Sequence, residues 1–374
     1  MSDPSLTPPP RRPPGPPPPL RPAARVPAEQ FQLPVERMRA GYYSDKYFVR
    51  TRDVLAASGR NPRVVMQVFQ KQDACLGGVD EAIALLKLCL TDGYSWADLA
   101  VDALRDGDFV APRETVMLVT GPLAAFAHLE TVYLGVLARR TRVATNTRRV
   151  VEAAWPKPVM FFPARFDHWL VQTGDGYAAH IAGAIGVSTD AQASWWGGRG
   201  MGTVPHGLIA AYGGDTVLAA RRFIETLGPQ MDVIVLVDFD NDCVGTAVAV
   251  ARALGPQLWG VRLDTSSTMV DRSLSPQMGR FDPRGVNPQL VRNVREALDR
   301  EGFSSVRIVA SGGFNVAKIA SFEEAAVPVD AYGVGSALIR GENDFTADVV
   351  VRDGHPAAKA GRGYLPNPRL EPVH

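Results

Sequence analysis

The sequence has little cysteine, little net charge and no long apolar run. Its three cysteines lie far apart, at Cys75, Cys89 and Cys243, and no CxxC pair is present. This argues against a disulfide framework and against a structural zinc site, and it favours a reducing, cytoplasmic setting. A formal net charge of +1 gives no global field that would attract nucleic acid or an anionic membrane. Any anion-binding site must therefore be local.

No uninterrupted apolar run reaches the roughly 18 residues that are needed to span a bilayer. The start of the chain is proline-rich rather than apolar, which does not fit a secretory signal. The composition is otherwise ordinary for a globular protein, with 46% hydrophobic and 21% charged residues. A chain of 374 residues can bury a large core, and about two domains are expected.

The pattern along the chain suggests four parts. Residues 1–35 contain the run PPPRRPPGPPPPLRP and are predicted to be a disordered or polyproline II tail, because they bury little apolar surface. Such a tail either solubilises the chain or recruits an SH3-like or WW-like partner. Residues 36–157 mix helical and strand patterns, and residues 158–340 alternate regularly between them. Residues 341–374 are polar and rich in proline and glycine, and are expected to return to the first domain.

The regular alternation after residue 158 predicts parallel βα units. The apolar run at 231–239 suits a parallel strand buried on both faces. Further strands are predicted at 258–263, 306–310 and 329–334, with helices between them. A closed or nearly closed α/β barrel is the economical arrangement, and its chemistry is expected at the carboxyl ends of the strands.

Two glycine-rich loops follow the last two predicted strands. Glycines there let backbone N–H groups approach phosphate oxygens, and both loops lead into helical segments whose N-termini favour anions. The glycines could instead only turn the chain, but two such loops in these places favour phosphate binding. The candidate phosphate-binding residues are Ser311, Gly312, Gly313, Gly333, Gly335 and Ser336.

Charged pairs stand two residues apart at the ends of two predicted strands. Arg262 and Asp264 therefore point to the same side, where Arg262 can clamp a phosphate or carboxylate and Asp264 can accept hydrogen bonds from ribose hydroxyls. Asp238 and Asp240 have the same spacing one strand earlier, and Asp238 is a candidate ligand for Mg²⁺ held partly by water. The alternative for each pair is a salt bridge at the barrel mouth.

The run Gly-Thr-Val-Pro-His at 202–206 places His206 at a turn that leads into a helical stretch. A neutral imidazole there can act as a nucleophile towards a phosphoryl group. A lone histidine is more often a core residue whose ring nitrogens are hydrogen-bonded. The interpretation of His206 as a nucleophile therefore depends on the residues beside it.

In their order and spacing these motifs resemble the nicotinate phosphoribosyltransferase family, the type II phosphoribosyltransferases, over most of the chain after about residue 41. Thr203 and His206 match the family motif GTxxH, whose histidine is phosphorylated by ATP. The run at 260–265 matches GVRxDS/T, and the run at 333–336 matches GVGT.

The resemblance implies an α/β sandwich over 36–157 joined to an irregular parallel α/β barrel over 158–340, in homodimers with shared active sites. It implies transfer of phosphoribose from phosphoribosyl diphosphate to nicotinate, coupled to ATP hydrolysis, in NAD biosynthesis, with Mg²⁺ as cofactor and ATP as co-substrate. It gives catalytic roles to His206, Arg262 and Asp264. The run at 44–47 resembles the TDxY element, whose tyrosine, here Tyr47, stacks on the pyridine of the neighbouring subunit.

Two departures from the family leave the pyridine open. Where the family carries a glycine and paired arginines, this chain reads Pro-Ala-Arg-Phe-Asp-His at 163–168. Phe162 and Arg165 are expected to contact the ring and its carboxylate, with His168 as a further basic group. Asp190 falls near the position where amide-using relatives carry aspartate and acid-using relatives carry a small hydroxyl residue, so nicotinamide is an alternative to nicotinate.

Three other functions are weighed against this reading. The TRKT and HR elements of quinolinate phosphoribosyltransferases are missing, which counts against quinolinate as substrate. A sugar-phosphate lyase would want a lysine on a strand, and the predicted strands contain none. A non-catalytic phosphoribosyl-binding scaffold with a recruiting tail is disfavoured by the presence of His206 and Arg262.

Overall fold

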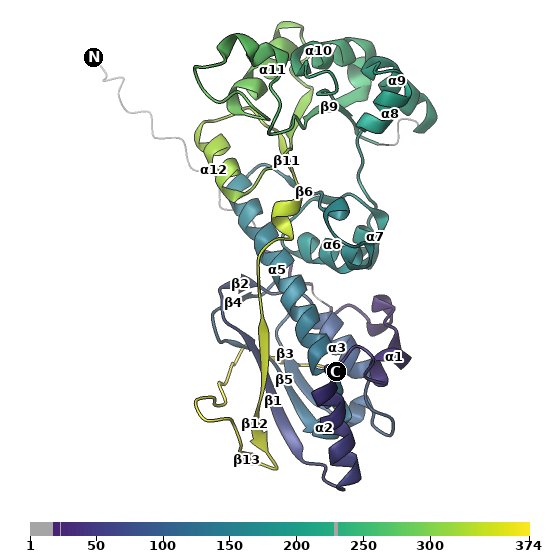
Figure 1. Ribbon diagram of the computed structural model, residues 1–374, viewed down its shortest axis with the longest axis vertical. Coiled ribbons are helices and arrows are strands. Elements are labelled where there is room, and N and C mark those ends of the chain that lie inside the picture. The colour runs from purple at the N-terminus through teal and green to yellow at the C-terminus, as the bar shows by residue number, and fades with distance from the viewer. Residues whose placement is uncertain (1–17, 23, 228–230) are drawn as a thin grey trace, which may run out of the picture.

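The computed structural model describes residues 18–22, 24–227 and 231–374. Two α/β parts lie end to end along an elongated molecule, and the long helix α5 (Glu130–Ala154) runs between them (Figure 1). One part is built on an antiparallel sheet and the other on a parallel sheet. The structure is thus the α/β combination that the sequence predicts.

The first part is a six-stranded sheet in the order β13-β12-β1-β5-β3-β14. Its strands are β1 (Arg63–Gln70), β3 (Ala100–Ala103), β5 (Thr115–Pro122), β12 (Phe345–Arg352), β13 (His355–Pro356) and β14 (Glu371–Pro372). Alternate residues of β1, Val64, Met66 and Val68, are buried in one core with α3 (Val79–Leu88) and the start of α5. Helix α2 (Lys46–Ala57) lies at the far end of this part (Figure 1).

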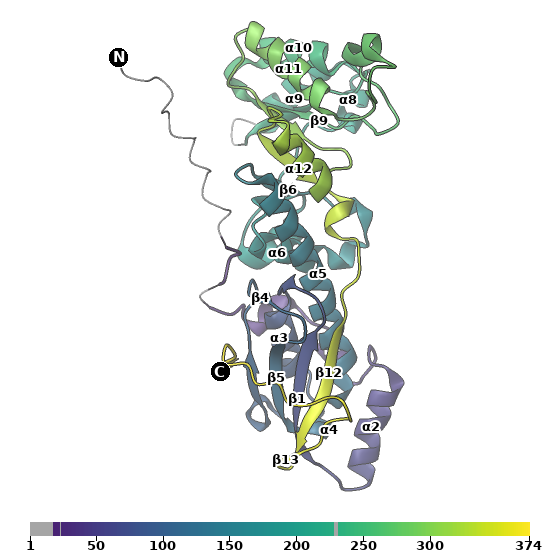
Figure 2. The ribbon, with the colours of Figure 1, turned by 90° about the vertical axis from the view of Figure 1, so that its left-hand side faces the viewer.

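The end of the chain returns to this first part. Strand β12 pairs antiparallel with β1, beside which it runs in the turned view (Figure 2), and β14 pairs with β3. On the face of the sheet opposite the core, the side chain of Gln67 donates to the carbonyl of Gly363 (3.3 Å) and accepts from the N–H of Leu365 (2.7 Å). The segment 341–374 therefore completes the sheet and covers part of its open face.

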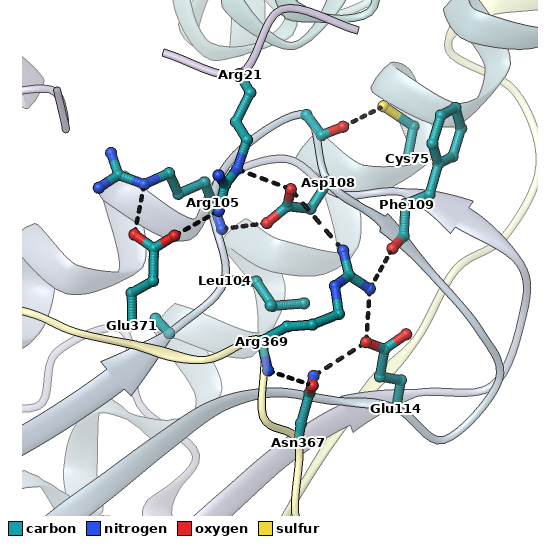
Figure 3. A network of polar contacts seen from close by, with 12 residues as sticks. Arg21, Cys75, Leu104, Arg105, Asp108, Phe109, Glu114, Asn367, Arg369 and Glu371 are labelled. Atoms are coloured by element: carbon teal, nitrogen blue, oxygen red, sulfur yellow. Dashed lines mark hydrogen bonds and ion pairs between the residues drawn. The ribbon is translucent and has the colours of Figure 1, made fainter. Parts of the chain in front are cut away.

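The beginning of the described chain is also packed against the first part. Arg25 donates to Asp80 (2.8 Å), and both side chains are largely buried. Arg21 pairs with Asp108 and with Glu371, so that the start of the chain, the loop before β4 (Phe109–Val110) and the last strand are tied together (Figure 3). The predicted disorder over 1–35 therefore does not extend to residues 18–22 and 24–35, because their arginines have acidic partners. The rest of that segment lies outside the described residues.

The second part is a six-stranded parallel sheet in the order β7-β6-β11-β10-β9-β8. Its strands are β6 (Val159–Phe161), β7 (Gly186–Val187), β8 (Val233–Leu236), β9 (Leu258–Leu263), β10 (Arg307–Ala310) and β11 (Ala331–Val334). The helices between them include α6 (Gln172–Ile181), α7 (Asp190–Ala193), α8 (His206–Ala211), α9 (Thr216–Leu227), α10 (Cys243–Leu254), α11 (Pro288–Arg300) and α12 (Val316–Glu324). The strands and helices predicted between 231 and 334 are confirmed.

The parallel sheet curves into a half-barrel and does not close. Beyond β8 it is extended only by a single bridge between Val204 and Val235, and its other edge is β7, which has two residues. The chain after β7 turns into short helices instead of continuing as a strand, which leaves this side of the barrel open. The irregular α/β barrel that the sequence predicts is therefore a half-barrel, open at this edge.

Candidate active site

A cavity of about 910 Å³ lies at the carboxyl ends of the parallel strands. It is lined from β9, from the loops after β6, β7, β10 and β11, and from the segment that leads into α8. The predicted site residues among its lining are Phe162, Arg165, Thr203, His206, Arg262, Asp264, Ser311, Gly312, Gly313, Gly333, Gly335 and Ser336. The sequence therefore located one continuous cavity from motifs that are far apart along the chain.

Arg262, Asp264 and Ser311 form a hydrogen-bonded group on one side of the cavity. The Nε of Arg262 donates to Ser311 Oγ (2.8 Å), and its Nη2 donates to Asp264 Oδ2 (3.2 Å). The hydroxyl of Ser311 lies 2.8 Å from Asp264 Oδ1, to which it can donate. Because β9 and β10 are parallel neighbours, these side chains meet at the same edge of the sheet. The ion pair leaves further guanidinium N–H groups of Arg262 for an anionic ligand.

The phosphate loops have the backbone conformations that their glycines permit. Gly312 and Gly313 have φ values of +87° and +72°, which other residues rarely adopt. In the second loop, a Cβ added to Gly333 would lie 2.8 Å from the ring of Phe162, and one added to Gly335 would lie 2.7 Å from the ring of Phe166. Glycine is thus required in both loops, in the first by conformation and in the second by the aromatic side chains beside it.

His206 is the first residue of α8, and its Nε2 lies 2.9 Å from Oδ1 of Asp238, which follows β8. Asp238 is buried, and burial raises the pKa of its carboxyl, while the hydrogen bond from His206 opposes that rise. An Nε2–H that donates to Asp238 leaves Nδ1 as the nucleophilic nitrogen. The alternative of a core histidine does not apply, because the side chain of His206 is 45% exposed.

The carboxylates of Asp238 and Asp264 at the carboxyl ends of the strands suit a metal ion that is bound together with substrate phosphates. They suit less well a metal ion that is held by protein ligands alone. No cluster of three His, Cys, Asp or Glu suited to a metal occurs among the described residues. Asp238 is engaged by His206, and Asp264 by Arg262 and Ser311. Mg²⁺ commonly binds through one or two carboxylates together with substrate phosphates and water, and this donor set is compatible with that mode.

Aromatic side chains from the loop after β6 also line the cavity, beside Arg262. The guanidinium of Arg262 lies over the ring of Phe162 at 5.0 Å, and that of Arg165 lies 5.5 Å from the ring of Phe166. Ser188 and Thr189, which follow β7, also line this region. Sequence reasoning placed Asp190 at the site but did not assign Phe166, Ser188 or Thr189 to it. A two-residue strand gives no periodic signal, so nothing placed Ser188 and Thr189 at a strand end.

Three predicted substrate contacts lie outside the cavity lining. The carboxylate of Asp190 accepts the N–H of Gly200 (2.8 Å), which fixes it within its own loop. Nδ1 of His168 accepts the N–H of Leu170 (3.3 Å), at the start of a 3₁₀ turn on the exposed surface. Tyr47 lies on α2 in the first part of the molecule, with 60% of its surface exposed. Within one chain, none of the three lines the cavity.

Comparison with known proteins agrees with the fold. Residues 45–141 match the family model of the quinolinate phosphoribosyl transferase N-terminal domain. A nicotinate phosphoribosyltransferase of Mycobacterium tuberculosis is 33% identical over 270 residues, which are 69% of this chain and 55% of the relative. The nicotinate-nucleotide pyrophosphorylase structure of Pyrococcus furiosus is 32% identical, with a TM-score of 0.76, over 90% of this chain and 84% of that one.

The fold is a parallel half-barrel joined to a second α/β part that is built on an antiparallel sheet. The chain belongs to the type II phosphoribosyltransferase family. The human nicotinic acid phosphoribosyltransferase shares the fold, with a TM-score of 0.63 at 18% identity over 84% of this chain and 75% of that one. The chain spans about half (55%) of the length of the Mycobacterium tuberculosis relative that it matches. Among the described residues, no helix is both long and apolar enough to cross a membrane.

Proposed function

We propose that this protein is a nicotinate phosphoribosyltransferase, which forms nicotinate mononucleotide and diphosphate from nicotinate and phosphoribosyl diphosphate. The observation that supports this most strongly is that the predicted groups line one cavity. Two glycine loops, the Arg262–Asp264 pair and an aromatic wall with Arg165 all line it. These groups match a phosphate, a ribose and an aromatic acid respectively.

The proposed reaction breaks the bond between the ribose C1 and the diphosphate oxygen and forms one between C1 and the pyridine nitrogen. The nitrogen lone pair is free at neutral pH, so no general base is needed. Asp264 accepts hydrogen bonds from the ribose hydroxyls, and the loops that contain Gly312 and Gly335 hold the 5′-phosphate. Arg262 stabilises negative charge as diphosphate leaves, and positioning supplies the rest. Bound Mg²⁺ would neutralise the departing diphosphate.

The choice of nicotinate rests on the charges that line the cavity. Arg165 and Arg262 are the arginines in the lining, and Arg262 is already hydrogen-bonded to Asp264. Arg165 can therefore bind one carboxylate, as nicotinate requires, whereas quinolinate carries two. Ser188 is a small hydroxyl residue that lines the cavity, while the carboxylate of Asp190 is bound to Gly200. A carboxylate at the ring site would favour nicotinamide, and Asp190 does not supply one.

ATP coupling and dimerisation belong to the same proposal. Phosphorylation of His206 at Nδ1 by ATP, with release of ADP, would couple ATP hydrolysis to the transfer. Tyr47 lies too far from its own cavity to contact the ring, and in a homodimer it would contact the pyridine of the partner subunit. We expect γ-labelled ATP to transfer an acid-labile label to the wild-type chain but not to His206→Asn. A label of equal size on both chains would exclude His206 as the acceptor.

The main test is product formation from phosphoribosyl diphosphate with nicotinate, nicotinamide or quinolinate, each with and without ATP. Nicotinate mononucleotide is the expected product. A non-catalytic phosphoribosyl-binding scaffold would bind the sugar phosphate and form no product with any of the three pyridines.

A further inference from the structure

Lys318 is a half-buried lysine beside the first phosphate loop that the proposed reaction does not use. It lies in the first turn of α12, where its backbone N–H is accepted by the capping side chain of Asn315 (2.9 Å). Its Nζ donates to the carbonyl oxygen of Gly312 (3.2 Å) and lies over the ring of Phe314 at 4.3 Å. Burial lowers the pKa of this ammonium group.

No carboxylate pairs with Lys318 among the residues that the structure describes. Removing an ammonium group from water is costly unless charge or hydrogen bonding compensates it. Lys157 offers a contrast, because its Nζ has both Glu323 (2.8 Å) and the carbonyl of Val327 (3.0 Å) as partners. Lys318 is a cation without a carboxylate partner, and it lies behind a loop that lines the cavity. Its positive charge therefore favours the binding of an anion on the cavity side of that loop.

The bond from Lys318 also fixes the direction of the loop. A trans peptide is planar, so the carbonyl of Gly312 and the N–H of Gly313 point in opposite directions. When Lys318 holds that carbonyl, it turns the N–H of Gly313 away from itself. Both glycines line the cavity, and in the described part of the chain their N–H groups have no hydrogen-bond acceptor. The backbone N–H of Ser311 anchors the other end of the loop by donating to the carbonyl of Leu263 (2.9 Å).

We propose that Lys318 is a positioning residue for the 5′-phosphate. It holds the Gly312 carbonyl so that the Gly313 N–H faces the phosphate, and it adds positive charge behind the loop. The side chain does not touch the reacting atoms. This inference rests on the proposed function, because it assigns the first loop to the phosphate of phosphoribosyl diphosphate.

The test compares wild type with Lys318→Met, which keeps the aliphatic contact with Phe314 but removes the ammonium group. Loss of a charged hydrogen bond of this kind should weaken phosphate binding by about tenfold or more. We expect the KM for phosphoribosyl diphosphate and the Kd for ribose 5-phosphate to rise by that factor. The KM for nicotinate should stay within about twofold, and Lys318→Arg should recover part of the loss, because it retains a charged donor.

Lys157→Met is the matched control, since it removes a partly buried ammonium from the neighbourhood of the same helix but away from the cavity. It should change the melting temperature and leave the KM for phosphoribosyl diphosphate unchanged. If Lys318→Met and Lys318→Gln both bind ribose 5-phosphate as wild type does, Lys318 is only structural and the inference is wrong. If wild type converts no pyridine while Lys318→Met still weakens ribose 5-phosphate binding, the proposed function fails and the inference stands.

Discussion

The Nε of Arg262 and the Oγ of Ser311 lie 2.8 Å apart, although 49 residues separate them in the chain. The first residue belongs to β9, and the second begins the glycine loop after β10. Ser311 also bonds to Asp264, the residue assigned to the ribose. The group that would hold the ribose and the loop that would hold its phosphate are thus connected directly, so a change at Arg262 should affect both.

Arg262→Ala should lower kcat/KM, with a loss of about 2–4 kcal/mol of transition-state stabilisation. This is the range for loss of a positioned hydrogen-bond donor in an active site. Steady-state kinetics with phosphoribosyl diphosphate measure this, with the melting temperature as a check on folding. Arg165→Ala is the informative comparison, because it should raise the KM for nicotinate far more than that for phosphoribosyl diphosphate. Kinetics of Arg262→Ala close to those of wild type would reduce this residue to an ion pair at the barrel mouth.

Ser188→Asp should lower nicotinate turnover by about tenfold or more, because it places a carboxylate in the region that receives the substrate carboxylate. Nicotinamide turnover should fall less, so the ratio of the two substrates shifts towards the amide. Asp190→Ser is the matched control and should leave that ratio unchanged, because Asp190 bonds to Gly200 outside the cavity lining. If Asp190→Ser shifts the ratio of nicotinamide to nicotinate turnover and Ser188→Asp does not, then Asp190 determines which pyridine is bound.

His128 should make the protein less stable as the pH falls from about 6.5 towards 4. It is fully buried, and burial lowers its pKa from 6.5 to about 4. Over this range His128 binds a proton in the unfolded chain but stays neutral in the folded chain, so the free energy of unfolding decreases as the pH decreases. His128→Gln should remove a pH-dependent loss on the order of 2 kcal/mol.

Urea unfolding at several pH values measures the effect of His128. The carboxyl of Glu130, whose pKa burial raises to about 7, works in the opposite direction, since protonation favours its folded form. The difference between wild type and His128→Gln isolates the histidine from such groups. Parallel pH profiles for the two proteins would contradict the assignment.

Arg25→Met should destabilise the protein by roughly 3 kcal/mol or more, because it leaves Asp80 buried without its charged partner. Arg21→Met should cost less than about 1 kcal/mol, because the side chain of Arg21 is 49% exposed. Chemical unfolding of both variants measures the difference. Equal stability of Arg25→Met and wild type would mean that this proline-rich segment contributes nothing to the fold.

The sequence revealed those site residues that stand at the ends of long, regular elements. Arg262 lies near the end of a six-residue strand and Asp264 directly follows it, and the glycine loops stand between clear strands and helices, so the sequence could place both groups at strand ends. The sequence assigned Asp190 rather than the nearby Ser188 to the site, because β7 has only two residues and gives no pattern that fixes the register. The sequence gives no sign of the role proposed for Lys318, because that role depends on a contact with a main-chain carbonyl, which no side-chain pattern reveals.

Composition was misleading at the start of the chain. Prolines indicate weak burial on average, but single arginines with buried acidic partners can still hold such a segment in place. Arg25 and Asp80 are 55 residues apart, and nothing in the local sequence links them. The alternation of elements predicts an irregular barrel but not how far it closes, because it does not show whether the edge strands are long enough to pair.

The most direct test of the proposed function is diphosphate and nucleotide formation from phosphoribosyl diphosphate with equal concentrations of nicotinate, nicotinamide and quinolinate. Asp264→Ala serves as the control for contaminating activity. The account predicts nicotinate mononucleotide and diphosphate in equal amounts, stimulated by ATP, with little product from the other two pyridines. Release of carbon dioxide from quinolinate as the main reaction, or no diphosphate release with any pyridine, would contradict it.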